Sequence, residues 1–240
     1  FRGCSFWPAY EIDLSNWDTS NVTNMESAFY GCGNLTTANI SGWDTSSCEN
    51  FSSMFAACTQ FNENISNWNV GSGKKFDVMF ATAETFDQPI GFWDMSSAED
   101  LNSMFLGSLA FNQPLNTWGQ NLSNVTNMSM MFGASAGVQS FNQDLNDWDV
   151  SSVENMSFMF FDNHNSATQN NFNGNISDWD TSSVTTMSMM FWQNNVFNQP
   201  IGNWDVSNCT NFMMMFNDCD AFDQNLGNWD ISGGTGGNPN

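Results

Sequence analysis

A tryptophan recurs along this chain at nearly constant intervals, and this repetition constrains the fold more than any local motif. Six of the eight intervals are 25 or 26 residues, and the other two are 30 and 31. The tryptophans that set the register are Trp17, Trp43, Trp68, Trp93, Trp118, Trp148, Trp179, Trp204 and Trp229. Each unit is too short to bury its own apolar face, so we expect it to be stabilised by stacking on its neighbours.

A second pattern follows each tryptophan. Apolar residues stand eight, eleven and twelve places after it, as Phe51, Met54 and Phe55 do after Trp43. This spacing is typical of one face of a short helix. Ser46 and Glu49, three and six places after Trp43, form a capping box, the usual start of a helix. The sequence therefore predicts one short helix in each unit.

The remainder of each unit predicts a strand. In "FNENI" (residues 61–65) and its equivalents, Phe and Ile or Leu stand four apart and would point to the same side of an extended chain. The position after the phenylalanine, expected to face solvent, carries nearly the same residue in each unit, which favours an asparagine ladder or a repetitive surface over a tailored binding pocket. The residues are Asn62, Asp87, Asn112, Asn142, Asn173, Asn198 and Asp223. The predicted fold is an α/β solenoid, leucine-rich-repeat-like, with about nine coils of about 25 residues and a short parallel strand plus a short helix per coil.

The repeat also resembles a known family. "WDTSNVTNMESAFYGCGNLTTANISGW" (residues 17–43) resembles the bacterial surface-protein repeat of about 26 residues found in mycoplasma lipoproteins and related surface proteins. It is also similar to the BspA-like leucine-rich repeat, through Ala28-Phe29, Cys32 and Leu35. The resemblance covers residues 11 to 231. It implies a secreted or surface-displayed protein, often adhesive, but supplies no ligand.

Composition indicates one elongated domain. We expect a partial cap at residues 1–10, one repeat array at 11–232 and a glycine-rich tail or linker at 233–240, with inserted loops at 133–140 and 161–171. No apolar run approaches the length of a membrane span, so membrane insertion is not expected. Three Lys and Arg against 25 Asp and Glu give a net charge of −22, which excludes nucleic acid as a partner because phosphates need neutralising cations.

The cysteines predict an oxidising compartment. Cys48 and Cys58 stand five and fifteen places after one tryptophan, and Cys209 and Cys219 hold the same places in another unit. Together with Cys4 and Cys32, they predict the disulfides Cys48–Cys58, Cys209–Cys219 and Cys4–Cys32, each stabilising by roughly 2–4 kcal/mol. The competing interpretation is six buried thiols; zinc is a weaker one, because this spacing is poor for a zinc site.

An aspartate follows most of the tryptophans. The row consists of Asp18, Asp44, Asp94, Asp149, Asp180, Asp205 and Asp230. The simpler hypothesis is that each one caps the helix that follows. The other is that Ca²⁺ bridges successive coils, as the only cofactor the sequence suggests. We expect the tryptophans to pack on one another at a corner of each coil, with an exposed, sugar-stacking row as the alternative.

Sequons for N-glycosylation are frequent, although Asn, Ser and Thr are simply common in this repeat. They begin at Asn21, Asn34, Asn39, Asn50, Asn64, Asn121, Asn124, Asn127, Asn155, Asn175 and Asn208. No nucleophile signature or phosphate loop is present, and His164 is a lone loop histidine, so we expect no enzyme.

The sequence thus predicts a non-enzymatic extracellular or cell-surface protein with a structural or adhesive role. It would belong to a surface appendage or filament that assembles through the solenoid ends, with itself or neighbouring surface proteins as partners. The alternative is an adhesin module that binds glycans or proteins through its sheet face and inserted loops.

Overall fold

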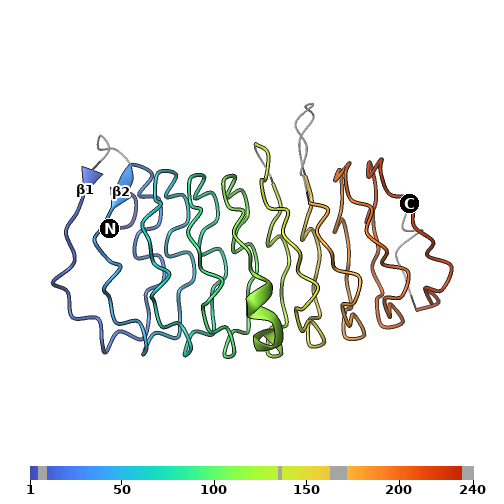
Figure 1. Cartoon of the computed structure of the whole chain (residues 1–240), viewed down its shortest axis with the longest axis horizontal. Helices are drawn as coiled ribbons and strands as arrows, with labels where there is room; N and C mark the ends of the chain where they lie inside the picture. Colours follow the sequence, from blue (N-terminus) through green and yellow to red (C-terminus); the bar gives the residue numbers. More distant parts are fainter. Residues whose placement is uncertain (5–9, 135–136, 163–171, 234–240) are drawn as a thin grey trace.

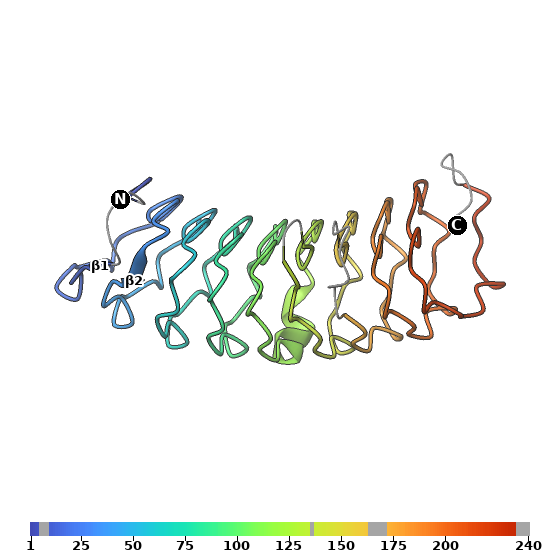
Figure 2. The ribbon, with the colours of Figure 1, turned by 90° about the horizontal axis from the view of Figure 1, so that it is seen from above.

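The computed structural model describes residues 1–4, 10–134, 137–162 and 172–233. Successive repeats form loops that stand side by side in a row, with the N-terminal and C-terminal parts at opposite ends (Figure 1). A second view shows the same row, gently curved (Figure 2). We call the loop formed by one repeat a layer.

Regular secondary structure is scarce in these layers. Strands β1 (Tyr10–Glu11) and β2 (Leu35–Thr37) form a parallel pair, and the 3₁₀ helix η1 spans Asn116–Leu122. The described ranges contain no α-helix, and beyond the β1–β2 pair their parallel pairing consists of isolated bridges, the first of them Asn24 to Asn50. The predicted leucine-rich-repeat-like α/β solenoid, with a strand and a helix in each of about nine coils, is therefore wrong. No helix among the described residues is long and apolar enough to cross a membrane.

Backbone hydrogen bonds between layers replace the expected helix. The Met25 amide donates to the Asn50 carbonyl at 2.8 Å, the Ser27 amide to Ser52 at 2.9 Å, and the pattern recurs along the row. The intervening amides donate three residues back within their own layer, as Ala28 does to the Met25 carbonyl at 3.1 Å. Alternate amides thus point at the next layer, so an α-helical bond pattern cannot form.

Left-handed residues in each layer produce this alternation. The residue ten places after the tryptophan has a positive φ, 55° at Ser27 and 56° at Ser53, and in most layers so does the residue fourteen places after it, 70° at Gly31 and 58° at Ala57. A left-handed residue turns the amides that follow it toward the next layer. The hydrogen bonds within a layer, from each intervening amide to the carbonyl three residues earlier, keep the side chains that point into the core at a helix-like spacing. The apolar periodicity therefore looked helical although the backbone is not.

Side-chain amides replace the expected strands. The Asn62 Oδ1 atom accepts a hydrogen bond from the Asp87 amide at 3.0 Å, and the Gln88 Nε2 atom donates to the Asn62 carbonyl at 3.0 Å. The same contact links each later member of the row to the next, which confirms the predicted asparagine ladder. Phe61 and Ile65 both point inward, as expected. The asparagines carry out the interlayer pairing that backbone carbonyls perform in a sheet.

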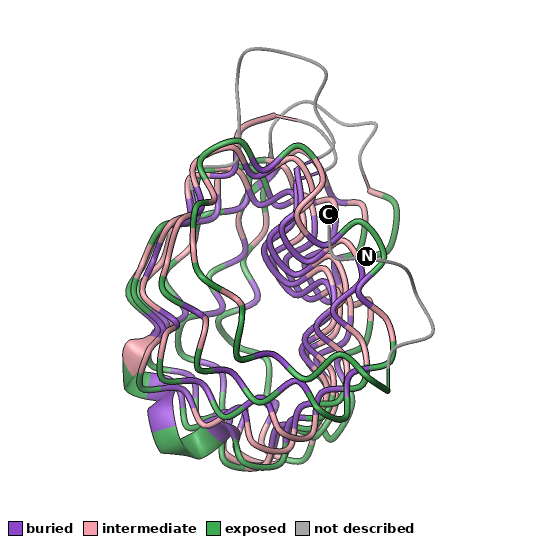
Figure 3. Ribbon diagram, turned by 90° about the vertical axis from the view of Figure 1, so that its right-hand side faces the viewer, coloured by how far each residue is buried: buried purple, intermediate pink, exposed green. Residues whose placement is uncertain are grey.

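Aromatic rings form columns through the core. Tryptophan rings stack from Trp17 to Trp68 and from Trp118 to Trp229, with the centroids of Trp43 and Trp68 at 6.3 Å, and the Trp68 indole donates to the Ile40 carbonyl at 3.0 Å. A parallel column of phenylalanines includes Phe29 and Phe55 at 5.5 Å. Buried residues recur at the same sides of successive layers in a view along the row (Figure 3). The predicted packing of tryptophan on tryptophan is confirmed, and the alternative of an exposed row is wrong.

Some predictions concern residues outside the described ranges. His164 and residues 163–171 of the second inserted loop lie outside them, as do residues 135–136 of the first loop. Residues 5–9 of the predicted cap and residues 234–240 of the predicted tail are likewise not described. The predicted domain boundaries therefore remain predictions.

Adjacent aromatic residues provide a test of the stacked core. Trp93 is buried and donates to the Ile65 carbonyl at 3.3 Å, whereas the Phe92 side chain is 87 % exposed. We expect Trp93→Ala to lower the free energy of unfolding by about 3–5 kcal/mol through cavity formation, measured by chemical denaturation. We expect Phe92→Ala to change it by less than about 0.5 kcal/mol. Equal losses in the two variants would contradict the described packing.

Candidate functional site

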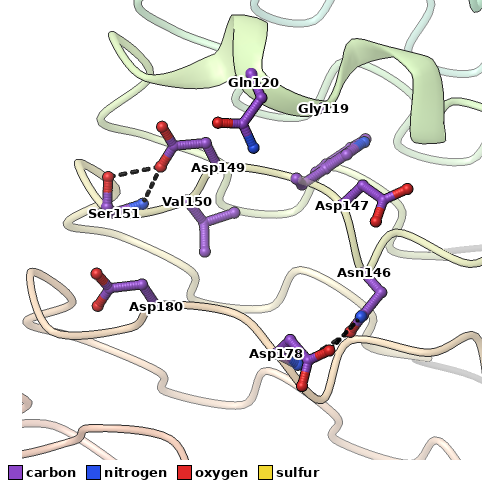
Figure 4. A pocket seen from close by; sticks show the side chains of 10 residues that line it. Gly119, Gln120, Asn146, Asp147, Asp149, Val150, Ser151, Asp178 and Asp180 are labelled. Carbon is purple, nitrogen blue, oxygen red and sulfur yellow. Dashed lines mark hydrogen bonds between the residues drawn. The ribbon is translucent and has the colours of Figure 1, made fainter.

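The clearest departure from the repeat surrounds η1, and a groove lies there. Its volume is about 660 Å³, and it runs over three successive layers. Figure 4 shows the residues that line it, which are Gly119, Gln120, Asn146, Asp147, Trp148, Asp149, Val150, Ser151, Asp178 and Asp180. This volume is in the range of small-molecule sites, but the lining is largely polar.

Gly119 opens one wall of the groove. It stands where most repeats have the aspartate after tryptophan, and its φ of 26° and ψ of −111° interrupt the helical conformation of η1. The Gly119 carbonyl accepts a hydrogen bond from the Asp149 amide at 3.0 Å, so this layer stays attached to the next. A Cβ atom at this position would lie 3.4 Å from the Asp147 carbonyl oxygen.

Two reciprocal Asn–Asp contacts border the groove. The Asn146 Nδ2 atom donates to Asp178 Oδ2 at 2.7 Å, and Asn146 Oδ1 accepts from the Asp178 amide at 2.9 Å. Asn116 and Asp147 make the equivalent pair of bonds one layer earlier. Sequence reasoning missed these pairs. A signal was present, because Asp147 and Asp178 directly precede their tryptophans, where the other repeats have no acidic residue.

The aspartate row caps turns rather than helices. Oδ1 of Asp44 accepts hydrogen bonds from the Ser46 amide at 3.0 Å and from the Ser46 hydroxyl at 2.6 Å. The other six aspartates each accept from the amide two residues on, through the same oxygen. This is an Asx turn. The predicted role of a helix cap is wrong because no helix follows.

The calcium hypothesis is also contradicted. Nowhere in the described ranges do three His, Cys, Asp or Glu side chains come together as a metal ion would require. The serines offset the mutual repulsion of the row. Their hydrogen bonds are the largest cause of the lowered pKa of Asp44, whereas the nearby Asp18 charge raises that pKa more weakly. The same serine contact lowers the pKa of Asp18, Asp205 and Asp230.

The groove has the chemistry of a surface that accepts hydrogen bonds. Four carboxylates line it without coming together as a metal site would require, and the lining contains no basic side chain. The Ser151 hydroxyl donates to Asp149 Oδ1 at 2.6 Å and has no histidine beside it among the lining residues, so it lacks the activation that a nucleophile needs. The arrangement can accept hydrogen bonds from a ligand, but it offers no acid–base pair.

The predicted disulfides are wrong. All six cysteines lie in the described ranges, and no disulfide joins any of them. The Cys58 thiol donates to the Phe29 carbonyl of the preceding layer at 3.0 Å, and the Cys32 thiol to the Phe1 carbonyl at 2.9 Å. Cys48 instead contacts the Asn50 carbonyl of its own layer at 3.4 Å. The two cysteine positions therefore serve separate contacts and do not face each other.

Most sequon asparagines have structural partners. Oδ1 of Asn50, Asn64, Asn127, Asn155 and Asn175 accepts from the amide two residues on, as in the aspartate row. The side chains of Asn124 and Asn208 donate to carbonyls of the preceding layer. These hydrogen bonds give the asparagines of the sequons a structural role. Asn21, Asn39 and Asn121 are exposed and Asn34 is partly exposed, and glycosylation stays a prediction.

The serine contact can be tested by titration. We expect Ser46→Ala to raise the pKa of Asp44 toward its ordinary value, because the hydroxyl donor is lost. A carboxyl group whose pKa is lowered by folding stabilises the folded state at pH values above its unfolded-state pKa. This stabilisation is lost as the pH falls through the folded-state pKa, so we expect the variant to lose less stability than the parent protein on acidification below pH 4. NMR of the carboxyl carbons measures this, with Asp205 as internal control. An unchanged Asp44 would contradict the assignment.

Thiol reactivity tests the correction to the disulfides. Burial raises the pKa of Cys219 to about 12 and also raises that of Cys58. At pH 8 the Cys219 thiolate fraction is then on the order of one in ten thousand. We expect the five buried cysteines to resist iodoacetamide in the folded protein, and all six to react in denaturant without reductant, as read by mass spectrometry. Fewer than six labels would indicate a disulfide.

Comparison with known proteins places the chain in a family. No curated protein and no solved structure matches it. One family model, described as "Mycoplasma protein of unknown function, DUF285", matches residues 1–118, 86–168 and 165–236. These matches together cover nearly the whole chain, including the groove and both ends of the row, so the chain belongs to this mycoplasma protein family.

Proposed function

We propose that the protein is a non-enzymatic extracellular structural or adhesive repeat protein. It is a component of a surface appendage or filament, and it assembles through the ends of its stack of layers. Its partners are further copies of itself or neighbouring surface proteins.

One observation carries the proposal. The repeated polar side chains form hydrogen bonds that build turns or join layers, as Asn62 does with the next layer and Asp44 with its own turn. Repeated polar side chains that are engaged in turns and between layers suit a structural repeat, in which each unit is stabilised by its neighbours. Membership of the mycoplasma family and the resemblance to surface-protein and BspA-like repeats support the same assignment.

The groove beside η1 is the place where we expect adhesive contacts. Four carboxylates and the side-chain amides of Gln120 and Asn146 line it, and no basic side chain does. Such groups suit the hydroxyls of a glycan or the amides and cations of a protein partner. The sheet face proposed from the sequence is not a candidate, because the described residues form only the two-stranded β1–β2 pair.

Surface labelling of whole cells tests this function. Lys74 and Lys75 are both exposed, and Lys74 forms a 2.8 Å ion pair with Glu49 that leaves it half exposed. We expect a membrane-impermeant amine reagent to label the protein on intact cells that produce it. Electron microscopy with a specific antibody should then place it on surface structures.

A variant supplies the control for that experiment. Replacing both lysines, as Lys74→Arg and Lys75→Arg, keeps the charge and removes the two amines, so labelling should fall sharply while antibody binding stays. Labelling that appears only after cell lysis would contradict an extracellular location.

A further inference from the structure

The asparagine ladder has one irregular place, where its residue is followed by a glycine. Asn173 precedes Gly174, and this is the single Asn-Gly pair in the sequence. The other members of the row precede glutamine or, at Asn62, glutamate. A glycine has no Cβ atom, so no side chain shields the backbone nitrogen that follows the asparagine. Asn173 is therefore the ladder position at which that nitrogen is least shielded from the asparagine side chain.

Close packing of two layers explains why a glycine stands here. A Cβ atom at Gly174 would lie 2.2 Å from the Gln143 carbonyl oxygen. This layer therefore passes too close to the preceding one for any side chain at this position. The Gly174 amide donates to no acceptor among the described residues, so no hydrogen bond within them holds its proton.

The next layer places hydrogen-bond donors on both oxygens of Asn173. The Gln199 Nε2 atom donates to the Asn173 carbonyl oxygen at 2.7 Å and to Asn173 Oδ1 at 3.1 Å. The Asn198 amide also donates to Oδ1, at 2.9 Å. Two donors therefore polarise the side-chain carbonyl, and one polarises the peptide carbonyl that is bonded to the Gly174 nitrogen.

Both sets of contacts favour attack of the Gly174 nitrogen on the Asn173 side chain. A donor on the peptide carbonyl stabilises the negative charge that the nitrogen acquires when it loses its proton. Donors on Oδ1 stabilise the charge that develops there when the nitrogen bonds to Cγ, as in an oxyanion hole. The reacting groups belong to adjacent residues, so the reaction needs no encounter between separate molecules.

We infer that Asn173 and Gly174 form a self-modification site, at which water hydrolyses the asparagine through a cyclic imide. The Gly174 nitrogen bonds to Cγ of Asn173, and the bond between Cγ and Nδ2 breaks. Nδ2 leaves as ammonia with the proton that the glycine amide lost. Water then opens the ring, at Cγ to give aspartate or at the main-chain carbonyl to give isoaspartate.

The two products differ in their effect on the ladder. Aspartate fits it, since Asp87 holds an equivalent place and its Oδ1 accepts the Asn112 amide at 2.9 Å. Isoaspartate routes the main chain through the former side chain and lengthens it by one atom. This displaces Asn175, whose amide donates to Asp144 of the preceding layer at 2.8 Å. Both products add a negative charge, and isoaspartate also loosens the contact between two layers.

Ageing of the purified 240-residue chain tests the site. The folded protein is incubated at mildly acidic to mildly alkaline pH, and peptide mapping by mass spectrometry follows the change from amide to acid at each asparagine. Asn112 is the internal control, because it receives the same kinds of donor from the next layer but is followed by Gln113. We expect Asn173 to convert at least about tenfold faster than Asn112, since only the glycine lacks a Cβ atom. The rate should rise with pH, as base removes the Gly174 proton.

Two matched variants test the donors. Gln199→Ala removes the side chain that contacts both oxygens of Asn173, and Gln224→Ala removes the same contact one layer further on, at Asn198. We expect Gln199→Ala to slow the conversion of Asn173 roughly tenfold, because two stabilising contacts are lost. Gln224→Ala should leave that rate unchanged. Thermal unfolding of both variants checks that they are folded.

Three results would overturn the inference. The first is conversion of Asn173 no faster than that of Asn112, the second is conversion only in denaturant, and the third is an equal rate in the parent and in Gln199→Ala. The product has its own readout. Aged protein that carries isoaspartate should unfold at a lower temperature than the variant Asn173→Asp, which has the same charge and a normal main chain. Equal unfolding temperatures would contradict the loosened contact between layers.

Discussion

The backbone hydrogen-bond ladder between layers is the interaction on which the rest of the structure depends. Alternate amides such as Met25 and Ser27 donate to the next layer, and the intervening amides close turns within their own layer. Where a described layer follows, the amides in these segments therefore have partners without an α-helix or an extended sheet. The arrangement requires a left-handed residue in each layer, and non-glycine residues such as Ser27 and Val78 adopt it there. Hydrogen bonds along the whole row offset the conformational strain of these residues.

Side chains extend the same principle to the other sides of each layer. The Trp68 indole and the Oδ1 atom of Asn62 each form a bond between neighbouring layers, and the Asp44 carboxylate organises a turn within one. These roles explain why the same residues recur at fixed places. They also explain how so acidic a chain packs: among the described residues, Lys74–Glu49 is the single ion pair, and hydrogen-bond donors stabilise the carboxylates instead.

Irregularity of the repeat, rather than the repeat itself, creates the distinctive surface. Where Gly119 replaces an aspartate and η1 accommodates extra residues, a polar groove opens beside Asp149 and Asp180. Elsewhere the layers repeat one another closely. A structural or adhesive protein can use both properties, because a uniform row provides length and an irregular layer provides a local binding surface.

The sequence by itself determined the register, the stacking of the tryptophans and the asparagine ladder, because these depend on residue spacing alone. It also marked Asp178 as unusual, because an acidic residue precedes its tryptophan, but only the stacked layers bring Asp178 to Asn146. Only the tertiary structure decided the backbone conformation: the inward spacing of Met25 and Phe29 fits a helix equally well, and the choice is made by amides bonding to a neighbouring layer. Cys48 and Cys58, paired by position in the sequence, likewise make separate contacts: Cys48 meets the Asn50 carbonyl of its own layer, whereas Cys58 meets the Phe29 carbonyl, which only the stacked layers bring within reach.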